Sequence, residues 1–146
     1  MSVKTKEAVT KFKKGFNCSQ AVFSSYSEQF GLDSDVACKV ATGFGGGMRM
    51  AKTCGAVTGA FMVLGLKYGN NPEKDKEAKA NTYIKIEDFI NRFKARNETV
   101  ACGELLGCDI STPVGAKEAK DKGLFRSICP QLVQDASEIL EEMLNE

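Results

Sequence analysis

The sequence predicts an all-α fold, a single-domain bundle of about five or six helices with a glycine-rich loop. Apolar residues recur at the spacing of one helix face along most of the chain, and no segment alternates as a half-buried strand does. Glycines divide these segments, and there are only 3 prolines. With 146 residues, of which 42% are hydrophobic, the chain can bury a substantial core. Residues 1–146 are therefore expected to form a single cysteine-containing helical domain.

Three helices are expected in the first third of the chain. The first covers residues 5–14. The second follows an N-cap at Asn17, carries Cys18 in its first turn and ends at Gly31. The third begins after Asp33 or Ser34 and runs into the glycine-rich loop.

We interpret the rest of the sequence around residues 42–69, a glycine-rich loop followed by an apolar helix. The loop Gly43–Gly47 leads to Cys54, where an apolar helix begins that continues to Gly69. Glycines this dense imply unusual backbone angles or close approach of other groups. No strand precedes the loop and no Lys-Ser/Thr pair follows it at nucleotide-loop spacing, so a phosphate site is not favoured. At a helix start, Cys54 lies where backbone N–H groups favour a thiolate, and nearby Arg49 is expected to be exposed or to add to this effect.

The second half is expected to hold one long helix, a short turn, a polar connection and a final helix. The long helix covers residues 73–96, and the short turn contains Cys102. Residues 108–123 read as the connection, with a helical turn or two near its end. Pro130 suits the first turn of the final helix and places Cys129 at its start.

Composition excludes several classes of function. The net charge of +1 gives no general attraction to nucleic acid or to an anionic membrane. The longest apolar run is too short to span a membrane and no signal peptide is evident, so we expect a cytoplasmic protein. The absence of histidine removes Ser-His-Asp and Cys-His catalysis and histidine-ligated zinc. Six cysteines in the cytoplasm indicate metal binding, redox chemistry or simple burial.

Four of the six cysteines share one setting, the start of an expected helix: Cys18, Cys54, Cys102 and Cys129. Helix N-termini carry unpaired N–H donors and partial positive charge, which suit a thiolate or a thiolate-bound metal centre. If the bundle brings these ends together, four thiolates converge. Cys38 and Cys108 lack this setting and are interpreted as packing residues.

Several segments together resemble one bacterial and archaeal family. They are GFNCSQAVF around Cys18, GFGGGM followed by CGAVTGAFMVLGLKYG, CGELLGCD, and CPQLVQDASEIL. In this order they resemble the redox-active protein family named for the cysteine pattern C…GCAxxG…C…C. Cys54 and the residues to Gly59 match its central motif, and Cys18, Cys102 and Cys129 take the other cysteine positions. Part of the family is similar to split-Soret cytochromes, but without histidine or a C-x-x-C-H motif no haem is expected.

The leading hypothesis is a redox or electron-transfer protein in which Cys18, Cys54, Cys102 and Cys129 ligate an iron–sulfur cluster. A metal-free dithiol/disulfide redox or sensor protein is the alternative, followed by a non-catalytic helical protein that holds zinc or copper. The sequence identifies neither a redox partner nor a substrate and does not decide whether the chain is an enzyme. A homodimer is compatible with a small bundle.

Overall fold

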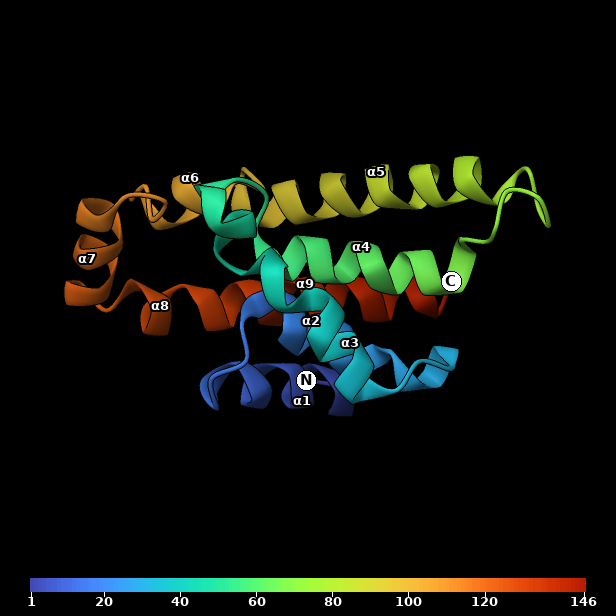
Figure 1. Cartoon of the computed structure of the whole chain (residues 1–146), viewed down its shortest axis with the longest axis horizontal. Helices are drawn as coiled ribbons and strands as arrows, with labels where there is room; N and C mark the ends of the chain where they lie inside the picture. Colours follow the sequence, from blue (N-terminus) through green and yellow to red (C-terminus); the bar gives the residue numbers. More distant parts are fainter.

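Helices account for most of the chain in the computed structural model, which describes residues 1–146 (Figure 1). The only extended pairing is an isolated antiparallel bridge between Thr53 and Ala101. The predicted all-α class is therefore confirmed. The α-helices are α1 (Val3–Lys13), α2 (Cys18–Tyr26), α3 (Ser34–Ala41), α4 (Gly55–Tyr68), α5 (Ala78–Asn97), α6 (Cys102–Leu106), α7 (Pro113–Asp121), α8 (Leu124–Ser127) and α9 (Cys129–Leu144).

Two 3₁₀ turns, η1 (Glu28–Phe30) and η2 (Thr42–Phe44), and the irregular segment η3 (Gly47–Ala51) complete the backbone. The chain thus contains more helical segments than the five or six expected. The largest difference lies in residues 108–123, interpreted as a polar connection, which contain α7. Thr112 caps this helix by accepting a hydrogen bond from the Gly115 N–H, and Pro113 is its first residue.

The long helix begins later than predicted, at Ala78 rather than at residue 73. Side chains in the preceding segment bond to backbone N–H groups and hold it in turns. Asn71 accepts from the Glu73 N–H at 2.9 Å, and Asp75 accepts from the Glu77 N–H at 3.0 Å. These local bonds compete with helix formation.

Helix α4 is the centre of the main core, with α2, α5 and α9 packed around it. Every residue from Gly55 to Ala60 is buried, so this part of the helix has no solvent face. A Cβ atom at Gly59 would lie 2.8 Å from the Ser19 carbonyl oxygen, so α2 approaches α4 this closely only because residue 59 is glycine. The small residues of α4 thus place the start of α2 directly against the start of α4.

A second, smaller core lies where α6, α7 and α8 meet the start of α9, at the end of the molecule opposite the 70–77 turn (Figure 1). It comprises Cys102, Leu106, Cys108, Ile110, Ala119 and Cys129. Three of the six cysteines are therefore in this core. The four-residue α8 leads directly into α9 and joins the two cores.

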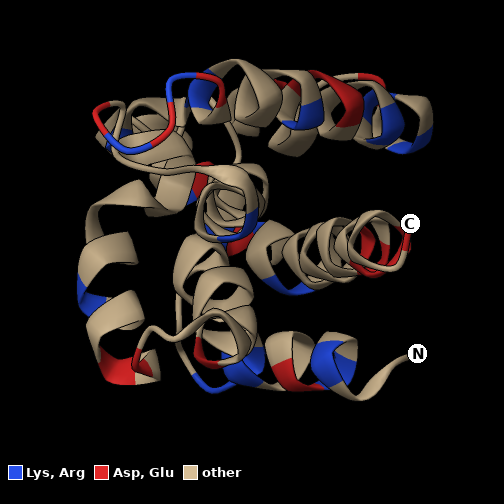
Figure 2. Cartoon of the chain, turned by 90° about the vertical axis from the view of Figure 1, so that its right-hand side faces the viewer, with Lys and Arg blue, Asp and Glu red and all other residues tan.

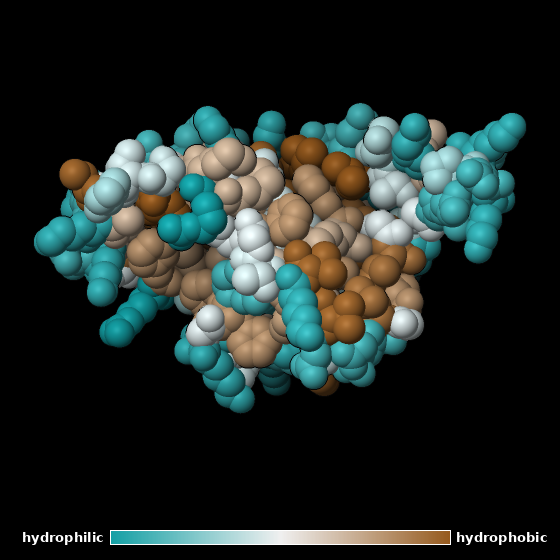
Figure 3. All heavy atoms as spheres, viewed as in Figure 1, coloured by the Kyte–Doolittle hydropathy of each residue, from teal (hydrophilic) through white to brown (hydrophobic).

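The molecular surface is of mixed polarity. Lys and Arg alternate with Asp and Glu along the outer helices (Figure 2), as the net charge of +1 suggests. Apolar side chains gather over α3 and α4 on one face (Figure 3), where Val36 and Val40 are exposed. None of the helices is both long enough and apolar enough to cross a membrane.

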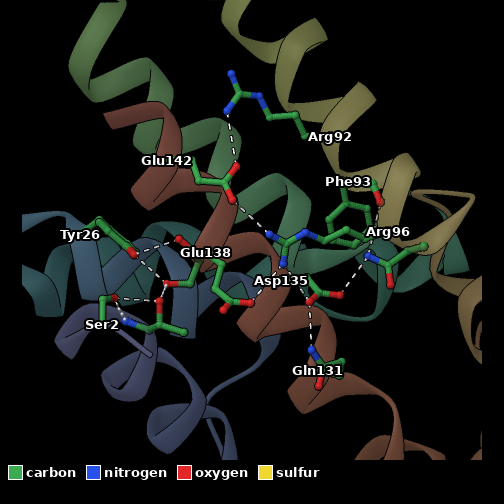
Figure 4. A network of polar contacts seen from close by, with 12 residues as sticks. Ser2, Tyr26, Arg92, Phe93, Arg96, Gln131, Asp135, Glu138 and Glu142 are labelled. Atoms are coloured by element: carbon green, nitrogen blue, oxygen red, sulfur yellow. Dashed lines mark hydrogen bonds and ion pairs between the residues drawn. The ribbon is translucent and has the colours of Figure 1, made fainter. Parts of the chain in front are cut away.

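Ion pairs and hydrogen bonds fix α9 to its neighbours (Figure 4). Arg96 on α5 faces three carboxylates of α9, those of Asp135 at 3.3 Å, Glu138 at 3.1 Å and Glu142 at 3.2 Å. Tyr26 on α2 reaches Oγ of Ser137 at 2.6 Å. These contacts hold α9 in place and thereby set the position of its first residue, Cys129.

Candidate functional site

The four cysteines singled out in the sequence line one cavity of about 210 Å³. They are Cys18, Cys54, Cys102 and Cys129. Cys54, Cys102 and Cys129 are buried, and Cys18 is partly buried. Cys38 and Cys108 do not line this cavity. All six thiols are free, without disulfides.

Each of the four cysteines lies at the N-terminus of a helix. Cys18, Cys102 and Cys129 are the first residues of α2, α6 and α9, and Cys54 is the N-cap of α4. A capping box fixes the start of α2. The Asn17 side chain accepts a hydrogen bond from the Gln20 N–H, and the Gln20 side chain accepts one from the Asn17 N–H. Four helix N-termini, and their N–H donors, therefore meet at the cavity.

Two backbone hydrogen bonds join the segments that carry Cys54 and Cys102. The Cys54 N–H donates to the Val100 carbonyl at 2.7 Å, and the Cys102 N–H donates to the Lys52 carbonyl at 2.5 Å. They flank the Thr53–Ala101 bridge. A single bridge has no periodic pattern in the sequence, so sequence reasoning did not find it. It fixes two of the four cysteines side by side on adjacent backbones.

The glycine-rich loop takes a left-handed path past the cavity. Gly46, Gly47, Met48 and Arg49 have φ angles of 62°, 63°, 60° and 62° in succession. A Cβ atom on Gly47 would lie 2.9 Å from the Cβ of Cys102, so the loop backbone packs directly against that cysteine. This confirms the expectation of unusual backbone angles and close approach. The left-handed angles of Met48 and Arg49, which are not glycines, are not evident from the sequence.

Burial and mutual contact determine the ionisation of the thiols. Burial raises the pKa of Cys54 to about 12, although the N–H groups of Ala56 and Val57 act in the opposite direction. Burial likewise raises the pKa of Cys102 to about 11. The N–H groups at the start of α4 thus favour the thiolate of Cys54 as expected, but desolvation outweighs them, and no N–H group lowers the pKa of Cys102.

Cys18 and Cys129 are close enough to affect each other's ionisation. This contact, together with burial, raises the pKa of Cys18 well above its usual value, and the same contact lowers the pKa of Cys129. A thiolate on Cys129 that accepts a hydrogen bond from Cys18 accounts for both directions. Cys129 is therefore the most readily ionised of the four thiols.

The remaining wall of the cavity is mainly apolar and contains one charged side chain. Phe12, Leu106, Ile110, Ala116, Phe125 and Leu132 supply the apolar surface, and Arg49 supplies the charge. In this conformation no three Cys, Asp or Glu side chains are grouped as ligands of a single metal ion.

Comparison with known proteins gives one match. A model of the family described as "Putative redox-active protein (C_GCAxxG_C_C)" matches residues 16–143, a range that includes all four cavity cysteines. Neither a curated protein nor a solved structure matches the chain.

Proposed function

The chain belongs to the redox-active protein family with the C_GCAxxG_C_C pattern, and on this premise we propose that it is an electron-transfer protein. In this proposal Cys18, Cys54, Cys102 and Cys129 ligate an iron–sulfur cluster. The observation that carries the proposal is that these four thiols, distant in the sequence, line one cavity. Thiolates are the usual protein ligands of such clusters, four to each cluster.

The size of the cavity supports a cluster better than a single ion. A water molecule occupies about 30 Å³ in the liquid, so a volume of about 210 Å³ corresponds to roughly seven waters. A zinc ion bound to four thiolates would leave most of this volume empty, whereas a [4Fe–4S] core, with its irons and sulfides, would fill a large part of it.

The protein would hold and tune the centre through its own residues. An iron–sulfur cluster, when bound, supplies one-electron transfer. The N–H groups of Ala56 and Val57, which act to lower the pKa of Cys54, would stabilise negative charge on its sulfur and favour the reduced state. The apolar walls exclude water. Because burial keeps Cys54 and Cys102 protonated, assembly of the centre must release their protons.

Anaerobic purification tests this proposal. The protein should be brown, absorb between 300 and 500 nm and contain iron and acid-labile sulfide. Replacing Cys18, Cys54, Cys102 or Cys129 by serine should lower the iron content, whereas Cys38→Ser, the matched control outside the cavity, should not. A colourless protein without iron, both as purified and after anaerobic reconstitution, would contradict it.

A second candidate function is supported by the Cys18–Cys129 pair. Its two thiols line the same cavity, each shifts the pKa of the other, and the pKa of Cys129 is lowered. Loss of two electrons to an oxidant and of both thiol protons would join the two sulfurs in a disulfide, with Cys129 as the attacking thiolate. Mild oxidation of iron-free protein should then remove two free thiols, and peptide mapping should find residues 18 and 129 linked. Unchanged thiol counts would exclude this mechanism.

A further inference from the structure

Arg49 is the only charged residue among those that line the cavity. Its side chain forms no ion pair, and no hydrogen bond to it is found. By contrast, Arg92 and Arg96 are both bound to carboxylates. Arg49 is exposed and also lines the cavity, so it lies where the cavity meets solvent. A guanidinium with all its donors free at the opening of an apolar cavity is suited to bind an anion.

The loop backbone directs this side chain back over Gly46. Nη1 of Arg49 lies 3.6 Å from the position that a Cβ atom on Gly46 would take, and Cδ1 of Ile110 lies 3.4 Å from the same position. The guanidinium is therefore held next to an apolar wall residue. Arg49 has φ 62° and ψ 11°, and Met48 before it is also left-handed. Such angles are unfavourable for a residue other than glycine, and they concentrate at ligand sites.

The charge of Arg49 acts apart from the thiols. The pKa shifts of the four cysteines come from burial, from one another and from backbone N–H groups, and Arg49 is not among their causes. The expectation that Arg49 stabilises a thiolate thus receives no support. The cavity instead presents two separate chemical groups, four thiols and one cation, with apolar side chains from α1, α7 and α8 in the wall between the helices.

We propose that this cavity binds a small organic carboxylate beside the four-cysteine centre, with its carboxylate on Arg49 and its apolar body against Phe12, Ile110 and Phe125. This inference rests on the proposed function, because it takes the four-cysteine cavity as the site of redox chemistry, and it names the class of substrate for that site. A carboxylate accepts two parallel hydrogen bonds from a guanidinium. The apolar wall has no further charged group that would select a dianion or a highly polar body.

The volume limits the size of the ligand. The cavity corresponds to roughly seven waters, so a molecule the size of benzoate is the upper limit, and beside a bound centre it would lie partly in the solvent opening at Arg49. Larger ligands such as nucleotides are excluded.

Calorimetric titration of the full chain, purified anaerobically, tests this inference with benzoate, phenylacetate and 3-methylbutanoate as probes. At least one should bind saturably, and its neutral amide should bind more weakly. Arg49→Gln should weaken binding by about tenfold or more, because a charge-assisted pair is lost. Arg49→Lys, which keeps the charge but not the fork, should give an intermediate affinity. Arg126→Gln is the matched control, since Arg126 is also exposed and unpaired but does not line the cavity.

Two results would overturn the inference: no saturable binding of any of the three carboxylates, or equal affinities in wild type and Arg49→Gln. The iron content of the same samples reports separately on the proposed function. Binding is also measured on iron-free, reduced protein. Carboxylate binding by a protein that takes up no iron would uphold this inference while contradicting the cluster, and iron uptake without carboxylate binding would do the reverse.

Discussion

At the scale of single residues, Tyr26 shows how burial sets the behaviour of a polar group. Its side chain is almost fully buried, and its hydroxyl reaches Ser137 at 2.6 Å and donates to Glu141 at 2.9 Å. Burial raises the pKa of Tyr26 well above the usual value near 10. The folded state therefore keeps the phenol neutral over a pH range in which the unfolded chain ionises it.

This difference predicts a stability effect that depends on pH. Below pH 10 both states are protonated, and Tyr26→Phe should lower the free energy of unfolding by about 1–3 kcal/mol, because Ser137 and Glu141 lose a buried partner. Above pH 10 only the unfolded state releases the proton, so the wild-type advantage should fall by about 1.4 kcal/mol per pH unit. Urea unfolding of both proteins at pH 8 and pH 11 measures the change. Thiol ionisation is common to both and cancels in the comparison.

Tyr83→Phe is the control for this measurement, because Tyr83 is exposed. Its unfolding free energy should match the wild type at both pH values. An effect of Tyr26→Phe that is the same at pH 8 and pH 11 would contradict the neutral, buried phenol.

Gly47 gives a prediction for the site itself. It has φ 63°, and a Cβ atom there would lie 2.9 Å from the Cβ of Cys102. Gly47→Ala should therefore displace the loop from Cys102 and lower the iron content after anaerobic reconstitution, with a stability loss of order 1–3 kcal/mol. Gly43→Ala is the matched control in the same loop, since a Cβ atom there would meet nothing within 4 Å. Equal iron content in the two variants would show that close packing at Gly47 does not matter for the centre.

At the scale of elements, the sequence predicted the main helices but not the joints that assemble the site. The sequence predicted α2, α4 and α9 from their periodic apolar residues, and it placed a cysteine at the start of each. Both were possible because helix spacing and capping are local properties. Helix α7 was expected only as a helical turn or two near the end of residues 108–123, and its start signal at Thr112 and Pro113 was not used. The Thr53–Ala101 bridge and the pairing of Cys18 with Cys129 join distant segments, so no local pattern carries them.

The α2–α4 contact makes an element-scale prediction. Gly59→Ala would place a Cβ atom 2.8 Å from the Ser19 carbonyl oxygen and force the two helices apart, which should destabilise the protein by about 1–3 kcal/mol. Gly65→Ala on the same helix meets nothing within 4 Å and should instead stabilise it by roughly 0.5–1 kcal/mol. Chemical unfolding of both variants measures the opposite signs. A neutral Gly59→Ala would show that the contact is not tight.

At the scale of the whole molecule, the four-cysteine cavity lies between two hydrophobic cores. Cys54 belongs to the main core, Cys102 and Cys129 belong to the smaller one, and Cys18 packs against both. The smaller core has only a few buried residues, supplied by short helices. A centre held by all four thiolates would connect the two cores. Helix α3 exposes apolar residues. The homodimer stays a prediction, and its interface is not determined.

This arrangement predicts that iron controls the order of one end of the molecule. Few buried contacts hold α6, α7 and α8, so they should open at low free-energy cost when the centre is removed. Amide hydrogen exchange of residues 102–127 should therefore speed up by tenfold or more in iron-free, reduced protein, while the buried residues of α4 change little.

Cys102→Ser, which lacks one ligand, should exchange quickly with or without iron in the buffer. Because α4 is enclosed by α2, α5 and α9 irrespective of the centre, it reports on global stability in the same experiment. Exchange that accelerates equally in α4 and α6–α8 would mean that the two cores unfold as one unit, and unchanged exchange in α6–α8 would mean that the thiols do not connect them.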